Sequence, residues 1–438
     1  MLLIMGPLLG RMGATVLLLL SGASLLVWTV LRIESVPSIL AFVPSRLTEG
    51  YHPSVYDDSA WSVQSVVTGN GSSTLRENIR SDVLYVTQWG MSIGMTNQFL
   101  SSLNLIYIGL LSTRVPVVPP FIPNKHIAGD KPLPFGDVFD FAYLRTQLRM
   151  PIIDWQDIKT SNETNDDMHC WALHKHIPAH ITADLGISSS YSELPAHTKG
   201  KKHQLITTLA DLLYPPNLVS QQRQVLPDAY VPNPPDKHIA CFDYLYYASS
   251  GGEYLDWDEG LSWPAWRVVG QHLRFAPKVM ELARGHIRNA LDLPVDAEIP
   301  PFISVHMRRG DFGSWCKGVA LDECLPSLPS YVQRVQEVKD ELASRGVHAE
   351  HVLVQSNERD LAFWEEVRSL GFANVDYTQE EQDGWAAIVL DACIQSMGAG
   401  FVGTSHSTVS LLSERRVKEW SGGPTRMVRW GKVGADDH

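Results

Sequence analysis

The residues Phe302-Ile-Ser-Val-His-Met-Arg-Arg-Gly-Asp311 form an apolar strand that ends directly in two arginines, a glycine and an aspartate. In open α/β sheets, ligands bind at the carboxyl ends of the strands, so this placement favours a binding site. Arginine is always charged and can grip phosphate through two parallel hydrogen bonds, which suits a pyrophosphate. Two other interpretations are an ion pair between Arg309 and Asp311 that closes the loop, and an Arg-Gly-Asp adhesion motif, which needs an exposed loop tip.

A second strand end lies about a hundred residues later, in Gly400-Phe-Val-Gly-Thr-Ser-His-Ser-Thr-Val409. Here a strand runs through Thr404, Ser405, Ser407 and Thr408 straight into a helix. Free N–H groups at a helix start, together with hydroxyls, bind anions. Ordinary capping of the helix by Ser405 or Ser407 explains the same residues, and both roles can hold at once. Both motifs are of a kind that binds phosphate, and each follows a strand of the same predicted domain. Together they strengthen the prediction of a phosphate-binding site.

Strands and helices alternate around these two motifs. We expect strands over 302–306, 351–355, 375–377 and 400–403, and helices over 331–344, 360–370, 384–397 and 407–420. This alternation is typical of a doubly wound parallel sheet, so residues 300–438 are predicted to form a Rossmann-like nucleotide-binding domain.

A second α/β unit is predicted earlier in the chain. A strand over 82–87, a glycine-containing turn over 89–97, a helix over 98–111 and a strand over 115–122 follow one another. This order starts a parallel sheet and defines an N-terminal domain over 81–290. Its middle part, 123–265, is rich in Pro, Asn, Asp and His and has no clear period, whereas 274–291 has helical periodicity.

The segment 12–31 contains no charged residue and is flanked by Arg11 and Arg32. A helix of that length spans about 30 Å, the thickness of a bilayer core. We therefore expect a transmembrane signal-anchor, with 1–11 as a cytoplasmic tail and 32–80 as a stem. A cleaved signal peptide and a buried soluble helix are the alternatives. A single-pass type II protein of this kind carries its bulk in the endomembrane lumen, and the sequons at Asn70 and Asn162 agree with that.

Five cysteines are present, and Cys316 and Cys324 enclose a short segment that a disulfide can close. Two buried free thiols are the alternative, and Cys393 is expected to be an inert core thiol. The histidines around Cys170 lack the spacing of a zinc site, so we interpret them as a chance grouping in a loop. Asp256-Trp-Asp258 could hold a divalent metal, but a solvated turn is the preferred interpretation. No metal site is predicted.

Length and composition limit the classes of protein further. The 438 residues exceed what one hydrophobic core supports, so two domains are expected. A hydrophobic fraction of 44% and a charged fraction of 19% exclude a disordered or collagen-like chain. The formal net charge of −12 argues against a nucleic-acid-binding surface, while small anions can still bind at local arginines.

The motif His306-x-Arg308-Arg309-Gly-Asp311, together with Phe401-Val-Gly-Thr-Ser-His-Ser-Thr408, resembles the GDP-fucose protein O-fucosyltransferases. The resemblance implies a GT-B fold, in which two Rossmann-like domains face each other across a cleft. It also implies an inverting, metal-independent enzyme of the secretory lumen that uses GDP-fucose as donor. The motifs span about 82–122 and 300–412, and the region 123–265 takes no part in the resemblance.

The resemblance assigns roles to individual residues. Arg308 corresponds to the arginine that binds the donor diphosphate and assists departure of GDP, and His306 to the histidine that lines the nucleotide pocket. Ser407 and Thr408 stand where the family places two serines on the phosphates. Asp391 stands where an acid reads the guanine, although a capping or buried structural acid is the alternative.

Asn97, in the turn Gly94-Met-Thr-Asn97-Gln98, resembles the asparagine of the family's Gly-x-Asn-Gln turn, with a different spacing. Asp311 is the nearest candidate for a catalytic base, but its neighbour Arg309 is expected to hold it ionised and to engage it, so no base is assigned.

The leading hypothesis is transfer of fucose from GDP-fucose to a hydroxyl acceptor, such as Ser or Thr of a secretory-pathway protein, in the Golgi or endoplasmic reticulum. One alternative is another sugar-nucleotide-dependent transferase on the same fold. The other is an anchored protein that binds GDP-sugars or glycans without turnover. The acceptor would be recognised by the N-terminal domain.

Overall fold

The computed structural model describes residues 61–69, 71–89, 94–123, 127, 131–159, 163–173, 179–214, 236–252, 255, 263–378 and 384–436. The expected anchor at 12–31, both sequon asparagines and the Asp256-Trp-Asp258 segment lie outside the described residues. Within the described ranges, no helix combines the length and the apolar character that crossing a bilayer requires.

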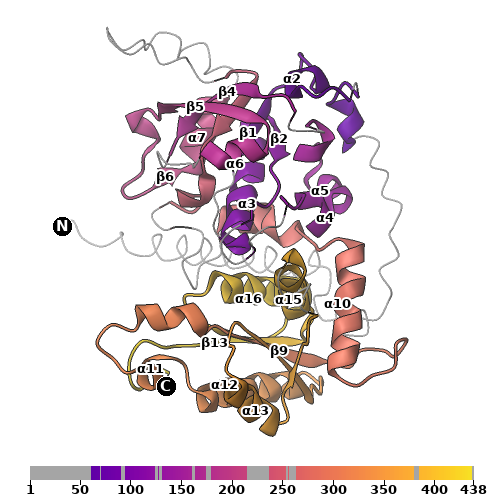
Figure 1. Ribbon diagram of the computed structural model, residues 1–438, viewed down its shortest axis with the longest axis vertical. Coiled ribbons are helices and arrows are strands. Elements are labelled where there is room, and N and C mark those ends of the chain that lie inside the picture. Colours follow the sequence, from indigo (N-terminus) through magenta and orange to yellow (C-terminus); the bar gives the residue numbers. More distant parts are fainter. Residues whose placement is uncertain are drawn as a thin grey trace, which may run out of the picture. The chain divides into compact units, whose positions relative to one another are not determined.

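The first half of the described chain is built on a six-stranded sheet in which all neighbouring strands are parallel (Figure 1). In spatial order the strands are β3 (Ile153–Asp154), β2 (Val115–Val118), β1 (Tyr85–Gln88), β7 (Ile239–Phe242), β4 (Asp166–Ala172) and β5 (Ile187–Glu193). A separate two-stranded ladder joins β6 (Gln204–Leu205) to β8 (Ala248–Ser249).

The second half is built on a five-stranded sheet, also parallel throughout. Its spatial order is β11 (Ala373–Asn374), β10 (His351–Ser356), β9 (Phe302–Met307), β12 (Gly400–Thr404) and β13 (Thr425–Val428). Every residue of β9 and β12 is buried, as expected for central strands covered by helices on both faces. Each of the two sheets falls within one of the two ranges predicted as domains.

Helices follow the strands in both halves. In the first half they are α2 (Leu75–Asn78), α3 (Met95–Ser112), α4 (Phe135–Val138), α5 (Phe141–Leu148), α6 (Ala179–Asp184), α7 (Ile206–Leu213), α9 (Pro264–Val268) and α10 (Pro277–Ala290). In the second they are α11 (Leu321–Cys324), α12 (Leu328–Ser344), α13 (Leu361–Ser369), α15 (Trp385–Met397) and α16 (Thr408–Ser421). Figure 1 shows α12 and α13 on one face of the five-stranded sheet and α15 and α16 on the other.

Short 3-10 turns complete the connections: η4 (Val63–Ser65), η5 (Trp155–Asp157), η6 (Ala196–Thr198), η7 (Leu245–Tyr247), η8 (Gly270–His272) and η9 (Gly310–Trp315). Residues 51–438 form one compact unit. One apolar cluster contains buried side chains from both halves, among them Phe99 of α3, Phe275 before α10, Trp385 of α15 and Leu412 of α16.

Two disulfides cross-link the described chain. Cys316 and Cys324 form the predicted bridge, with Cα atoms 5.8 Å apart. A second bridge joins Cys170 of β4 to Cys241 of β7, with Cα atoms 4.7 Å apart. The interpretation of Cys170 as part of a chance grouping in a loop is therefore wrong, because it lies in a strand and is covalently bonded. Cys393 is a buried free thiol, as expected.

Several predicted element boundaries need correction. Strand β1 begins at Tyr85, three residues after the expected start, and α12 begins at Leu328, three residues before it. The residues 375–377, expected to form a strand, have irregular backbone. The strand is β11, which lies immediately before them at 373–374. The strand expected over 115–122 ends at Val118, because Pro119 and Pro120 have no N–H to donate. Helix α3 begins at Met95, three residues before the expected start. The last residues of the expected turn over 89–97 therefore belong to the helix.

Candidate functional site

The carboxyl ends of β9 and β12 lie next to each other in the five-stranded sheet. Ile303, Ser304 and Val305 pair in register with 400–402, so the residues that follow the two strands meet at one edge. From β9 the chain proceeds to β10 on one side, while β12 and β13 lie on the other, so the strand order reverses at this point. A reversal of strand order leaves a crevice above the sheet, which is where α/β proteins bind ligands.

Thr404, at the end of β12, ties the two strand ends together. Its hydroxyl accepts the Arg308 N–H at 2.8 Å, donates to the carbonyl of His306 at 3.0 Å, and lies 2.6 Å from the Tyr331 hydroxyl. Thr404 is fully buried. The structure therefore places this predicted binding residue beneath Arg308, where its hydroxyl is already occupied and holds the arginine backbone in position.

His306 is a neutral side chain at this edge. Burial lowers its pKa to about 3, and the nearby Arg308 charge acts in the same direction. Its Nδ1 lies 2.7 Å from the Ser410 hydroxyl, which in turn accepts the Thr404 N–H at 2.9 Å. Because Ser410 already accepts one hydrogen bond, its own hydrogen is available for Nδ1. The other ring nitrogen of the neutral imidazole then carries a hydrogen that can be donated to a ligand.

The two arginines after β9 point to different partners. Arg308 forms an ion pair with Asp311, with Nη2 and Oδ2 2.7 Å apart, and lines a cavity. Arg309 pairs with Glu358 at 3.1 Å, donates to the Pro326 carbonyl at 3.1 Å, and does not line that cavity. The ion pair that closes the loop is thus formed by Arg308, and the expected Arg309–Asp311 pair is wrong.

Asp311 is held ionised at this site. Burial by itself would raise the pKa of the carboxyl, but the hydrogen bond and charge of Arg308 and a hydrogen bond from Asn357 lower it below its usual value. The Asn357 amide nitrogen lies 3.2 Å from Oδ1. A carboxylate with a depressed pKa and two partners is a weak proton acceptor, so the structure gives Asp311 the role of orienting Arg308.

Ser407 and Thr408 stand at the start of α16. The Ser407 hydroxyl accepts the Ser410 N–H at 3.4 Å, which is ordinary N-capping, and both Ser407 and Thr408 also line the cavity. His406, just before them, has a left-handed backbone with φ of 63°. The residue that caps α16 thus also lies in the wall of the cavity that Arg308 lines, where the N–H groups of a helix start can bind an anion.

Asp391 lies on α15 and also faces the cavity. One carboxyl oxygen accepts a hydrogen bond of 2.6 Å from the Tyr377 hydroxyl. Burial raises the pKa of Asp391 to about 7, although the Tyr377 hydrogen bond opposes the shift. No cation pairs with Asp391 within the described part of the chain. A partly protonated carboxyl in an otherwise apolar wall can accept hydrogen bonds from a ligand that offers two N–H groups.

Asn97 comes from the other half of the molecule. It lies in the first turn of α3, and the preceding residues Gly94, Met95 and Thr96 line the same cavity. Gly94 is the N-cap and provides no side-chain cap, so the N-terminus of this long helix opens toward the cavity. Two helix starts, those of α3 and α16, therefore face one space.

The cavity has a volume of about 840 Å³ and receives side chains from both halves. It brings together six of the predicted site residues: Asn97, His306, Arg308, Asp391, Ser407 and Thr408. Thr404 and Ser405 do not line it. The walls that sequence reasoning missed are mostly apolar or aromatic: Phe99, Phe139, Tyr246, Tyr247, Phe275, Phe312, Trp315, Ile388, Leu412 and also Arg416.

No local sequence pattern indicated that the apolar and aromatic residues would line the cavity. Phe139, Tyr246 and Tyr247 fall in the region 123–265, where no periodicity was readable, and only the packing of distant segments brings them to the cavity. Asn357, which positions Asp311, was likewise not predicted, although it follows β10 at the same sheet edge as Arg308. The rule that strand ends share an edge could have found it.

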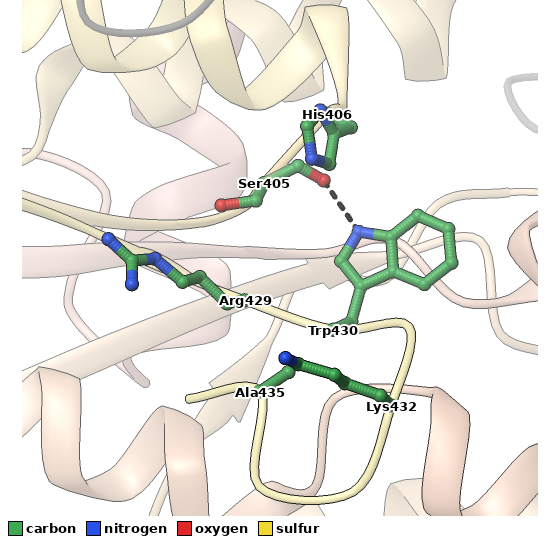
Figure 2. Close-up of a pocket in the computed structure, with 6 residues that line it drawn as sticks. All are labelled: Ser405, His406, Arg429, Trp430, Lys432 and Ala435. Atoms are coloured by element: carbon green, nitrogen blue, oxygen red, sulfur yellow. Dashed lines mark hydrogen bonds between the residues drawn. The ribbon is translucent and has the colours of Figure 1, made fainter. Parts of the chain in front are cut away.

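A smaller cavity of about 320 Å³ also has His406 in its wall (Figure 2). Ser405, His406, Arg429, Trp430, Lys432 and Ala435 line it. Figure 2 shows the Trp430 indole beside Ser405, and its Nε1 donates to the Ser405 carbonyl at 2.8 Å. Trp430 also packs on Phe312, with ring centroids 4.6 Å apart, so this cavity and the larger one share a wall.

No cluster of three or more His, Cys, Asp or Glu residues suited to a metal ion occurs among the described residues. The larger cavity combines two arginines, Arg308 and Arg416, with two helix starts and hydrogen-bonding side chains around a largely apolar space. These features can hold the diphosphate and base of a nucleotide.

Parallel sheets with a cationic cavity at the strand ends are typical of nucleotide-binding α/β proteins. Residues 93–418, about three quarters of the chain, match the GDP-fucose protein O-fucosyltransferase family. The chain therefore belongs to the GDP-fucose protein O-fucosyltransferase family, and it is a glycosyltransferase.

Solved structures support the fold. The apo form of POFUT1 gives a TM-score of 0.52 at 15% identity, covering 80% of this chain and 99% of that chain. POFUT1 in complex with GDP-fucose gives 0.52 at 17% identity, covering 81% and 99%. POFUT1 in complex with GDP gives 0.51 at 16% identity, covering 80% and 98%. No curated protein sequence matched the chain. At this identity the likeness shows a shared α/β fold with parallel sheets.

Proposed function

We propose that the protein transfers fucose from GDP-fucose to a hydroxyl acceptor, with inversion at the anomeric carbon, and that the acceptor is a Ser or Thr of a secretory-pathway protein. The observation that carries the proposal is the 840 Å³ cavity, which unites Arg308, the start of α16, Asp391 and Asn97. Family membership supports the donor, and POFUT1 binds GDP-fucose in its solved complex.

The diphosphate of the donor would bind between Arg308 and the start of α16. Arg308 is held by its backbone through Thr404 and by its side chain through Asp311, so the guanidinium is oriented before the ligand arrives. The N–H groups of the first turn of α16 and the hydroxyls of Ser407 and Thr408 add donors on the opposite side. His306 contributes a neutral N–H donor that does not change with pH in the physiological range.

The guanine would be recognised by Asp391. A guanine edge presents two neighbouring N–H donors, and an ionised carboxylate accepts both. Those hydrogen bonds favour the ionised form and so pull the pKa of Asp391 down from its value of about 7 in the free protein. Tyr377 keeps the carboxylate oriented through its hydroxyl.

The reaction is an in-line displacement. The acceptor hydroxyl attacks the anomeric carbon as the bond to the β-phosphate breaks, the acceptor proton leaves to a base, and GDP departs. Negative charge grows on the β-phosphate oxygen during this step, and preorganised donors at Arg308 and α16 stabilise it more than they stabilise the ground state. Asp311 and Asp391 are the carboxylates among the described cavity residues. Both already accept hydrogen bonds, so the base is left unassigned.

The covalent structure supports the proposed location. Two disulfides are typical of a protein that folds in an oxidising compartment, which supports a lumenal location. Anchoring through 12–31 as a single-pass type II protein is part of the proposal. Protease protection in sealed microsomes tests it: the bulk of the chain should be protected until detergent is added.

Titration of the full-length protein with GDP, followed by measurement of GDP-fucose consumption, tests the function. Arg308→Ala should weaken GDP binding and lower turnover roughly 100- to 1,000-fold, the usual cost of removing one preorganised donor. Arg309→Ala is the matched control, because this neighbouring arginine carries the same charge but pairs with Glu358 outside the cavity. Equal losses in both variants, or no GDP binding by the wild type, would overturn the proposal.

A second candidate function is GDP-sugar binding without turnover. The observation that favours it is that both cavity carboxylates are engaged, Asp311 with Arg308 and Asp391 with Tyr377. This candidate predicts GDP binding with no GDP-fucose consumption at any acceptor concentration. Measurable release of GDP from GDP-fucose excludes it, and a mass-shift screen with GDP-mannose in parallel separates fucose transfer from transfer of another sugar.

A further inference from the structure

Arg416, on the third turn of α16, is a buried cation without an acidic partner. Its side chain is about 3% exposed, and four aromatic rings surround the guanidinium carbon. The centroids of Phe99 and Phe275 lie 4.9 Å away, that of Trp420 5.8 Å and that of Phe139 5.9 Å. Within the described residues Arg416 forms no ion pair, and its Nε has no hydrogen-bond partner.

A guanidinium in this environment keeps its charge but loses most of its hydration. Burial lowers the pKa of Arg416 to about 9, which still leaves it charged at neutral pH. Aromatic faces attract a cation, yet they supply no hydrogen-bond acceptors for its N–H groups and no negative charge. Buried charges in proteins are normally paired, because an unpaired buried charge lowers the stability of the folded protein. A bound ligand of opposite charge can supply the missing partner.

The position of Arg416 on α16 indicates which part of a bound nucleotide it can interact with. Thr408, Val409, Leu412 and Arg416 all line the larger cavity, so one face of α16 forms its wall from the first turn to the third. Eight residues of helix separate Thr408 from Arg416, a rise of about 12 Å, and long helical side chains point back toward the N-terminus. Arg416 therefore lines the same cavity as the helix start, about two turns further along α16 from the place where the diphosphate is proposed to bind.

We propose that Arg416 is a further donor-binding residue whose missing counter-charge is the diphosphate of the bound nucleotide. It acts together with Arg308, which approaches from the strand side. Arg308 already has Asp311 as its partner, whereas Arg416 has none, so its charge is fully available to the ligand. This inference rests on the GDP-sugar binding proposed above.

Arg416→Met tests the proposal, because methionine keeps a long flexible side chain among the four rings and removes the charge. If the helix rise of about 12 Å is taken as the separation, with an effective dielectric of about 20, the lost attraction corresponds to a roughly 10-fold weaker affinity for GDP. Affinity for guanosine, which lacks the diphosphate, should change less than twofold. Arg416→Lys, which keeps the charge, should bind GDP within a few-fold of the wild type.

Arg415→Met is the matched control. Arg415 is the adjacent residue of the same helix, is also buried, and also packs on an aromatic ring, that of Trp266 at 5.7 Å. It does not line the cavity, so its loss should leave GDP affinity unchanged. Isothermal titration of the full-length variants with GDP and with guanosine measures all four expectations.

A thermal melt distinguishes ligand binding from a structural role. Without nucleotide, Arg416→Met should melt at or above the wild-type temperature, since an uncompensated buried charge is removed. With GDP, the wild type should gain more stability than the variant. Arg416→Gln serves as the neutral variant if the methionine protein is recovered unfolded.

Two outcomes would overturn the proposal. One is a GDP affinity of Arg416→Met within twofold of the wild type, and the other is misfolding of both neutral variants while Arg415→Met folds. The first outcome leaves the proposed function intact as long as the wild type binds GDP. Absence of GDP binding by the wild type itself contradicts the proposed function instead.

Discussion

Asp391 shows how burial sets the chemistry of a single residue. An exposed aspartate is ionised at any physiological pH, but in the wall of the cavity its pKa rises to about 7 because water is excluded. The same burial holds His306 neutral, with a pKa of about 3. The usual order of the two pKa values, with aspartate below histidine, is thus reversed, and of the two side chains only Asp391 titrates near neutral pH.

GDP affinity is expected to depend on pH through Asp391. The ionised carboxylate accepts the guanine N–H groups, so affinity should fall as pH drops below about 7, by up to tenfold per pH unit. Titrations with GDP between pH 5.5 and 8.5 measure this. Asp391→Asn should bind GDP more weakly and lose the part of the pH dependence that the carboxylate contributes, so that only the titration of the GDP phosphate remains. A wild-type profile with the same shape as that of the variant would contradict the assignment.

The free energy of unfolding should also depend on pH through Asp391, but it should fall with rising pH, whereas GDP affinity rises. The folded pKa of Asp391 is raised above its unfolded value, so between about pH 4 and pH 7 the native protein binds more protons than the unfolded chain. The contribution of Asp391 to the free energy of unfolding therefore decreases as pH rises through this window. Asp391→Asn should remove that decrease, which denaturant melts at pH 5 and pH 8 can detect.

At the scale of elements, the site depends on two adjacent strands and the helix that follows one of them. Arg308 directly follows β9, and α16 follows β12. Because β9 and β12 are paired, this pairing sets the distance between Arg308 and the start of α16. Thr404 joins them through hydrogen bonds to the backbone N–H of Arg308 and the carbonyl of His306. The left-handed residue His406 connects β12 to α16, and the first residues of the helix line the cavity.

Thr404→Val should weaken this junction. Valine has the shape of threonine but leaves the Arg308 N–H and the Tyr331 hydroxyl without a partner in a buried place, which costs about 2 kcal/mol or more of unfolding free energy. Urea melts measure the loss, and GDP affinity should fall as Arg308 loses its anchor. Thr404→Ser keeps the hydroxyl and should retain most of the stability and affinity. Equal effects of both substitutions would show that the methyl group matters instead.

At the scale of the whole molecule, both halves contribute to one apolar cluster and one cavity. Trp385 of α15 donates to the carbonyl of Lys131 at 2.9 Å, and its ring lies 6.2 Å from that of Phe121. Trp420 of α16 donates to the carbonyl of Gln271 at 2.9 Å. Helices of the second half are thus bonded to the backbone of the first, and we expect the described unit to unfold as one.

Trp385→Ala should lower the free energy of unfolding by roughly 3 kcal/mol, as expected for removal of a large buried aromatic side chain. The denaturation curve should shift as a single transition, because the lost contact joins the two halves. Trp364→Ala is the control: Trp364 lies on α13 and donates to Glu358 within the second half. A split transition for Trp385→Ala, with one half unaffected, would contradict cooperative unfolding.

Local patterns allowed the sequence alone to predict the α/β class, the strand over 302–306, the strand over 400–403 and the Cys316–Cys324 bridge. They also identified Arg308, Ser407 and Thr408 as candidates, because a strand end and a helix start are encoded within a few residues. Several features required the tertiary structure, since each depends on residues far apart in the chain. These are the Cys170–Cys241 bridge, the pairing of Asp311 with Arg308, the burial of Thr404, and the aromatic surroundings of Arg416.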